Sequence, residues 1–112
     1  MLLAGGAGDA VRGAELVANR APAACVLCHA VPGVPAYQSG QLAPDLAGVG
    51  ARWSADELRQ RLVAPERVNP DTIMPSYART QGFERVTPAL VGRPILDAQQ
   101  IEDVVAYLAG LK

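Results

Sequence analysis

The chain has 112 residues, which is enough for one domain but near the lower end of what builds a core alone. Hydrophobic residues make up 50% of it and aromatic residues only 4%, so a small core needs bulk from another source, such as a bound cofactor. A formal charge of −1 without long runs of one sign argues against nucleic acid or an anionic membrane as a partner, and no apolar stretch is long enough to span a membrane. We expect residues 1–8 to be a flexible N-terminal segment or signal remnant, and residues 9–112 to form a single domain.

The first expected helix begins at Asp9, a residue type that caps helix N-termini, and ends near Asn19 or Arg20. Its apolar stripe comprises Val11, Leu16 and Val17. Gly13 lies inside this helix, either because a second helix approaches closely or because a glycine is tolerated on the surface.

Residues 25–29 read Cys-Val-Leu-Cys-His, a spacing typical of covalent attachment of a c-type haem. Two residues between the cysteines let one turn of backbone present the sulfurs of Cys25 and Cys28 to the porphyrin edge. His29 then lies beneath the iron as its first axial ligand. The pattern predicts one covalent haem c in the chain.

Three other interpretations of this motif fit the residue inventory less well. The chain has two cysteines and one histidine, so a structural zinc site, which takes four Cys or His ligands, would be incomplete. A thioredoxin-like motif needs a strand and helix around it, and strand patterns are hard to find here. A disulfide between residues three apart would leave His29 unexplained. Because haem c is attached outside the bacterial cytoplasm, we expect a periplasmic protein exported by an upstream signal peptide.

Proline and glycine recur from Val31 to Gly50, which excludes a long helix and predicts a loop. Long loops usually have a function, and this one is expected to cover the His29 side of the haem. A ligating histidine normally donates its other N–H to a carbonyl or carboxylate. The carbonyl of Pro44 is the candidate acceptor.

Ser54 and Glu57 match a capping box and begin a short helix that Pro65 ends. Its apolar face carries Leu58 and Leu62. Four arginines surround this helix and are expected to be mostly solvated: Arg52, Arg59, Arg61 and Arg67. Forked donors suit the haem propionates, and the candidate propionate contacts are Arg52, Arg67 and the indole N–H of Trp53.

Met74 lies in an arm, residues 69–77, in which prolines on both sides favour extended backbone. A methionine in a small protein usually fills the core. Here elimination favours an iron ligand, because the only other methionine is Met1, His29 is the only histidine and the only lysine is Lys112. If protein groups fill both axial positions, Met74 supplies the second.

A last helix is expected after Asp97, which forms a second capping box with Gln100. Tyr107 is expected to pack against the first helix or the haem edge. The buried stripe of this helix comprises Ile101, Val104, Val105, Leu108 and Leu111.

A first helix, Cys-x-x-Cys-His, a Pro-x-Leu-x-Gly loop, a methionine in a proline-flanked arm and a terminal helix, in that order, resemble class I cytochromes c across nearly the whole chain. Within that class the sequence is similar to the SoxX family, the small haem subunits of bacterial SoxAX sulfur-oxidation complexes. Three stretches carry this likeness: residues 42–52 (LAPDLAGVGAR), 69–77 (NPDTIMPSY) and 99–108 (QQIEDVVAYL).

The resemblance implies an all-α class I cytochrome c fold, with few helices and long loops around one covalent haem. It also implies a periplasmic location, axial ligation by His29 and Met74, and a heterodimer with a SoxA-like cytochrome. Such complexes act as L-cysteine S-thiosulfotransferases that join thiosulfate to a cysteine of a SoxYZ-like carrier. The SoxX-like subunit receives electrons and relays them to a downstream acceptor, so it is itself expected to be non-catalytic.

Two other functions remain open at this stage: a free-standing cytochrome c that shuttles electrons, and a haem enzyme with an open iron position, such as a peroxidase. The second requires that Met74 does not bind iron. For an electron carrier, we expect a haem-bearing partner to dock at the exposed porphyrin edge. The expected contacts are Val26, Leu27, Pro75 and Tyr77.

Overall fold

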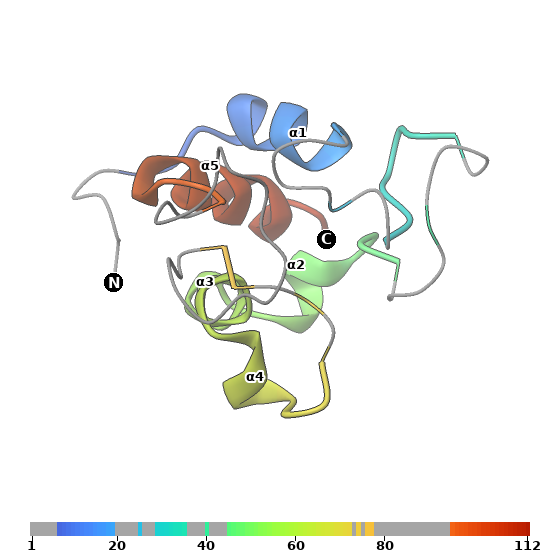
Figure 1. The fold of residues 1–112 in the computed structure, drawn as a ribbon. Helices are drawn as coiled ribbons and strands as arrows, with labels where there is room; N and C mark the ends of the chain where they lie inside the picture. Colours follow the sequence, from blue (N-terminus) through green and yellow to red (C-terminus); the bar gives the residue numbers. More distant parts are fainter. Residues whose placement is uncertain are drawn as a thin grey trace.

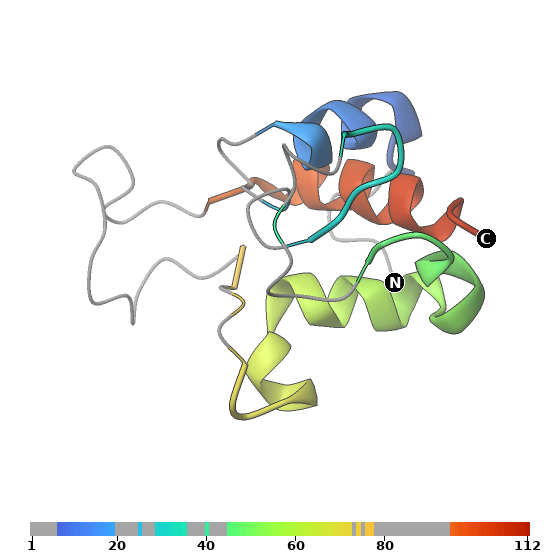
Figure 2. The same cartoon turned by 90° about the vertical axis from the view of Figure 1, so that its right-hand side faces the viewer.

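The structure is a computed structural model, and it describes residues 7–19, 25, 29–35, 40, 45–72, 74, 76, 77 and 95–112. Its helices are α1 (Ala10–Ala18), α2 (Val49–Arg52), α3 (Ala55–Val63), α4 (Pro65–Val68) and α5 (Ala98–Ala109). No β-strand occurs among the described residues. The long helix α5 lies between α1 on one side and α2 and α3 on the other, with α4 beyond α3 (Figures 1 and 2).

The expected helix starts are confirmed by their caps. The side chain of Asp9 accepts hydrogen bonds from the backbone of Val11 and Arg12. Ser54 with Glu57, and Asp97 with Gln100, form complete capping boxes at the starts of α3 and α5. Each box satisfies backbone N–H groups that have no partner inside the helix.

Pro65 ends α3 as predicted, because it has no backbone N–H to continue the helical hydrogen bonds. The same proline is the first residue of α4, a position where its fixed φ is favourable. The proline stop was predicted, but the additional turn after it was not.

Glycine allows α1 and α5 to pack closely. A Cβ atom on Gly13 would lie 1.9 Å from the carbonyl oxygen of Asp103, and one on Gly8 would lie 1.9 Å from that of Glu102. Close helix contact is therefore the reason for Gly13, and Tyr107 packs against the same place as expected. The assignment of Val11 to the apolar stripe was wrong, because this residue is 71% exposed.

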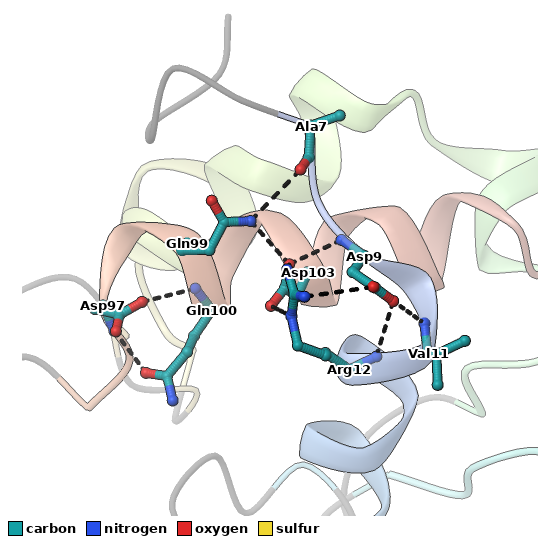
Figure 3. Close-up of polar contacts among 8 residues, drawn as sticks. All are labelled: Ala7, Asp9, Val11, Arg12, Asp97, Gln99, Gln100 and Asp103. Atoms are coloured by element: carbon teal, nitrogen blue, oxygen red, sulfur yellow. Dashed lines mark hydrogen bonds and ion pairs between the residues drawn. The ribbon is translucent and has the colours of Figure 1, made fainter.

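Asp103 joins α1 to α5 through a cluster of polar contacts (Figure 3). Its carboxylate accepts hydrogen bonds from the backbone N–H of Asp9 at 2.8 Å, from Nε of Arg12 at 2.9 Å and from Nε2 of Gln99 at 2.9 Å. The bond from Arg12 is the main reason why the pKa of Asp103 falls from 3.8 to about 2. The buried carboxylate is held in its charged form.

Glu102 joins α5 to α3 in the same manner. Its carboxylate accepts two hydrogen bonds from the guanidinium of Arg59, at 2.7 and 2.8 Å, and Arg59 also pairs with Asp56. Both Arg59 and Glu102 are buried. The expectation of a solvated arginine was therefore wrong for Arg59, and the contact from Glu102 raises its pKa further.

The short helix α2 is held against the end of α5. Gly48 precedes it in the left-handed conformation, with φ of 77°, which favours glycine. The N–H of Gly50 donates to the carbonyl of Leu111 at 2.8 Å, and a Cβ there would lie 2.3 Å from the carbonyl oxygen of Ala109. This segment was expected to be a loop, because four residues give little helical signal in a sequence.

Among the residues that the structure describes, we find no helix with the length and hydrophobicity needed to cross a membrane.

Candidate haem site

A cavity of about 530 Å³ is formed by residues from α2, α3, α4 and α5 together with the segments around His29 and Met74. Its apolar wall includes Leu46, Val49, Leu58, Leu62 and Leu108, all of which are also buried core residues. Exposed residues, among them Asp45, Arg52 and Asn69, complete the lining, so the cavity reaches the surface. The result is an apolar pocket with a polar rim.

The cavity brings together the two predicted axial ligands, since His29 and Met74 both line it. The backbone N–H of His29 donates to the carbonyl of Cys25 at 2.9 Å, which joins the first and last residues of the motif. Cys25 is buried. Cys28, the second predicted attachment residue, lies outside the described residues.

A hydrogen bond joins the residues around Leu46 to the residue that follows the motif. The N–H of Leu46 donates to the carbonyl of Ala30 at 3.0 Å, and Asp45, Leu46 and Ala47 all line the cavity. This agrees with a loop that covers the His29 side. Pro44, predicted to accept a hydrogen bond from His29, lies outside the described residues.

The Met74 arm is held by hydrogen bonds on both sides of the methionine. Before it, the N–H of Met74 donates to the hydroxyl of Thr72 at 3.1 Å. After it, the hydroxyl of Ser76 donates to the carbonyl of Val63, and the N–H of Tyr77 donates to the carbonyl of Leu62 at 2.9 Å.

Tyr77 is 4% exposed, so its expected role as a docking contact was wrong. Its backbone runs between α3 and the start of α5, which removes its ring from the surface. The other three expected contacts, Val26, Leu27 and Pro75, lie outside the described residues.

Of the three candidate propionate contacts, two line the cavity. Trp53 is half-buried there, and Arg52 is exposed, with its guanidinium near the carbonyls of Ala47 and Asp45 at 3.4 and 3.3 Å. Arg67 lies on α4, is exposed and does not line the cavity.

Arg61 lines the cavity but was not singled out from the sequence. Its guanidinium carbon lies 3.7 Å from the centre of the Trp53 ring, a cation–π contact at the cavity wall. A sequence signal did exist, because Arg61 follows the core residue Leu58 by three positions and therefore shares its side of α3. It is a further cation available to an anionic group in the pocket.

Comparison with known proteins gives a family for this chain. Residues 10–112 match the cytochrome c family. The chain belongs to the cytochrome c family. Among solved structures, this cytochrome is similar to a chain in the crystal structure of SoxXA from P. pantotrophus, with 35% identity and a TM-score of 0.88. The match covers 100% of this chain and 88% of that one. A comparison with curated protein sequences gave no match.

This cytochrome therefore has the all-α class I fold and carries a covalently bound haem c. The described residues fit that group. The pocket is walled by aliphatic side chains, as a porphyrin face requires, and it is lined by one imidazole and one thioether, which are donors that haem iron accepts. The cations Arg52 and Arg61 among its lining residues suit a group that carries two carboxylates.

Proposed function

We propose that this cytochrome is the electron-accepting haem subunit of a periplasmic SoxAX-type complex, the SoxX-like partner of a SoxA-like cytochrome. The observation that carries the proposal is the likeness to a chain of SoxXA over the whole of this sequence. At 35% identity the likeness extends to sequence as well as fold. Export by an upstream signal peptide is part of the proposal.

The proposed attachment residues are Cys25 and Cys28, and the proposed axial ligands are His29 and Met74. Support for the ligands comes from the cavity, where both side chains line the same apolar pocket. A thioether opposite an imidazole raises the reduction potential of the iron. The haem, when bound in this way, supplies a site that accepts and returns one electron.

The chain's own residues favour electron relay over sulfur chemistry. Once Cys25 and Cys28 hold the haem and His29 binds iron, the sequence has no other cysteine or histidine. Nucleophilic catalysis through those side chains is then excluded. Joining thiosulfate to the cysteine of a SoxYZ-like carrier is accordingly assigned to the complex, and this subunit passes the released electrons to a downstream acceptor.

The test reconstitutes the reaction from purified components: the holoprotein, a SoxA-like cytochrome from the same organism, the reduced carrier and thiosulfate. We expect the haem of this cytochrome to become reduced, and the carrier to gain the sulfur adduct, only when all components are present. Carrier mass and haem absorbance report the two events separately.

Two outcomes would contradict the proposal. A sulfur adduct formed by this chain without the SoxA-like cytochrome would show that it is catalytic. Persistent monomer in the presence of that cytochrome, with no haem reduction, would instead favour a free electron shuttle.

A further inference from the structure

We infer that Ser76 is a positioning residue, which holds the Met74 arm against the end of α3 and so keeps the thioether in the haem pocket. The inference rests on the proposed ligation by Met74. It concerns how the ligand is kept in place, through a hydroxyl two residues further along the chain.

The end of α3 offers hydrogen-bond acceptors because the helix is interrupted. The last four carbonyls of a helix have no intrahelical partner. The carbonyl of Gln60 accepts a hydrogen bond from the N–H of Ala64. The next residue, Pro65, has no N–H to donate. The N–H of Arg67 donates to the carbonyl of Ala64 at 3.1 Å, outside α3. The carbonyls near the C-terminus of α3 are therefore left for groups from outside the helix.

The Met74 arm donates hydrogen bonds to two of these carbonyls. The hydroxyl of Ser76 donates to the carbonyl of Val63, the last residue of α3, and the N–H of Tyr77 donates to that of Leu62. Ser76 is 3% exposed, so water does not compete freely for these groups. We call the hydrogen bonds of Ser76 and Tyr77 to the end of α3 the anchor. Leu62 itself lines the cavity, so the anchor lies directly beside the pocket.

The anchor also connects the arm to α5. The carbonyl of Tyr77 accepts a hydrogen bond from the N–H of Leu96 at 3.1 Å, and Leu96 directly precedes Asp97, the N-cap of that helix. Met74 thus lies between a partly buried hydrogen bond to Thr72 on one side and the buried residues Ser76 and Tyr77 on the other. Loss of the Ser76 hydroxyl weakens the buried side.

Weakening the anchor raises the fraction of molecules in which the thioether has left the iron. An external ligand binds only that fraction, so its apparent affinity rises in proportion. One neutral hydrogen bond corresponds to about a fivefold change in such an equilibrium. We therefore expect Ser76→Ala to bind imidazole in the ferric state about fivefold more tightly than the unaltered holoprotein.

The control is Ser54→Ala, which removes a hydroxyl from the capping box at the other end of the same helix. Losing an N-cap destabilises a protein to a similar degree, yet the hydroxyl of Ser54 accepts its hydrogen bond from Glu57 within the helix, and Ser54 does not line the cavity. Imidazole affinity should not change in this variant. Unfolding by urea is measured for both variants, so that a general loss of stability is distinguished from release of the arm.

Met74→Ala separates failure of this inference from failure of the proposed ligation. If Met74→Ala abolishes the ferric thioether charge-transfer band and binds imidazole far more tightly, Met74 is the ligand. If Ser76→Ala then binds imidazole with the same affinity as the unaltered protein, only the role of Ser76 is overturned. The same follows if Ser54→Ala changes the imidazole affinity as much as Ser76→Ala does. If Met74→Ala changes neither band nor affinity, ligation by Met74 is wrong and the inference falls with it.

Discussion

Asp103 shows how one buried carboxylate can stabilise a helix pair. Three donors surround it, from the backbone of Asp9, the guanidinium of Arg12 and the amide of Gln99, and each favours the charged form. Burial opposes that form, but the donors prevail, and the pKa falls to about 2. The charge on Asp103 is therefore linked to folding.

Asp103→Asn should lower the free energy of unfolding at neutral pH by about 2–3 kcal/mol, because lowering the pKa of Asp103 from 3.8 to about 2 is worth that much. A carboxylate whose pKa is lowered in the folded state contributes stability above its unfolded pKa. The contribution declines as pH falls from 3.8 towards about 2. Urea unfolding of both proteins across this range gives the measurement.

The difference between the two proteins should thus shrink at acidic pH. Asn keeps the shape of the side chain and one acceptor oxygen, so packing is little changed. A difference that stays constant between neutral and acidic pH would mean that the charge of Asp103 is not its cause.

The structural role of a residue could be predicted where it depends on neighbours in sequence. It could not be predicted where it depends on a partner far away in the chain. The caps at Asp9, Ser54 and Asp97 follow from residues within four positions, and all three are present. Burial of Glu102 was not foreseen, because its partner Arg59 lies 43 positions away. A charged residue in an amphipathic helix is usually solvated, and only the fold shows otherwise.

At the scale of elements, the contact between α1 and α5 depends on absent side chains. Gly13 faces the backbone of α5 so closely that a Cβ would lie 1.9 Å from the carbonyl oxygen of Asp103. A fixed backbone carbonyl cannot move aside as a flexible side chain does. Any larger residue must separate the helices.

Gly13→Ala should destabilise the protein by about 1–3 kcal/mol, the usual cost of overpacking. Alanine is intrinsically better than glycine inside a helix by about 1 kcal/mol, so a net loss shows that the contact outweighs propensity. Thermal unfolding followed by circular dichroism provides the test, with about 4–8 °C of Tm expected per kcal/mol.

Gly110→Ala is the matched control. Gly110 has an ordinary φ of −81°, and the nearest atom to its Cβ would lie 3.4 Å away. This substitution should leave stability unchanged or raise it by a few tenths of a kcal/mol. Equal effects at the two positions would contradict the close contact as the cause.

The longer elements could be predicted from periodicity and caps, whereas α2 and α4 could not. Each of these has four residues, too few for a periodic pattern, and depends on what surrounds it. α2 is held by the hydrogen bond from Gly50 to Leu111 at the end of the chain. For the site, the motif and the methionine of the proline-flanked arm predicted His29 and Met74 as ligands, which both line the cavity, whereas the contact of Arg61 with Trp53 at the cavity wall needed the fold.

At the scale of the molecule, the apolar wall of the proposed haem pocket is made of residues that also belong to the hydrophobic core. Val49 of α2 and leucines of α3 and α5 line the cavity and are also part of the hydrophobic core. The low aromatic content is consistent with this arrangement, since only 4% of the residues are aromatic. The haem supplies bulk that side chains do not.

Removing the haem should therefore remove most of the stability of the fold. An empty cavity costs about 24 cal/mol per Å³, so a space of about 530 Å³ corresponds to on the order of 10 kcal/mol as an upper limit. The cavity reaches the surface, and water entering it lowers this cost. A small domain has a total free energy of unfolding of about 5–15 kcal/mol. Even half of this upper limit would therefore be enough to unfold much of a typical small domain.

The variant to compare is Cys25→Ser with Cys28→Ser, produced under conditions that attach haem to the unaltered chain. We expect it to lack a cooperative thermal transition, because the core residues Leu58, Leu62 and Leu108 would then face an empty cavity. Far-ultraviolet circular dichroism against temperature gives the measurement, and intact mass confirms that haem is absent. A haem-free protein that melts as sharply and as high as the holoprotein would show that the core forms without the cofactor.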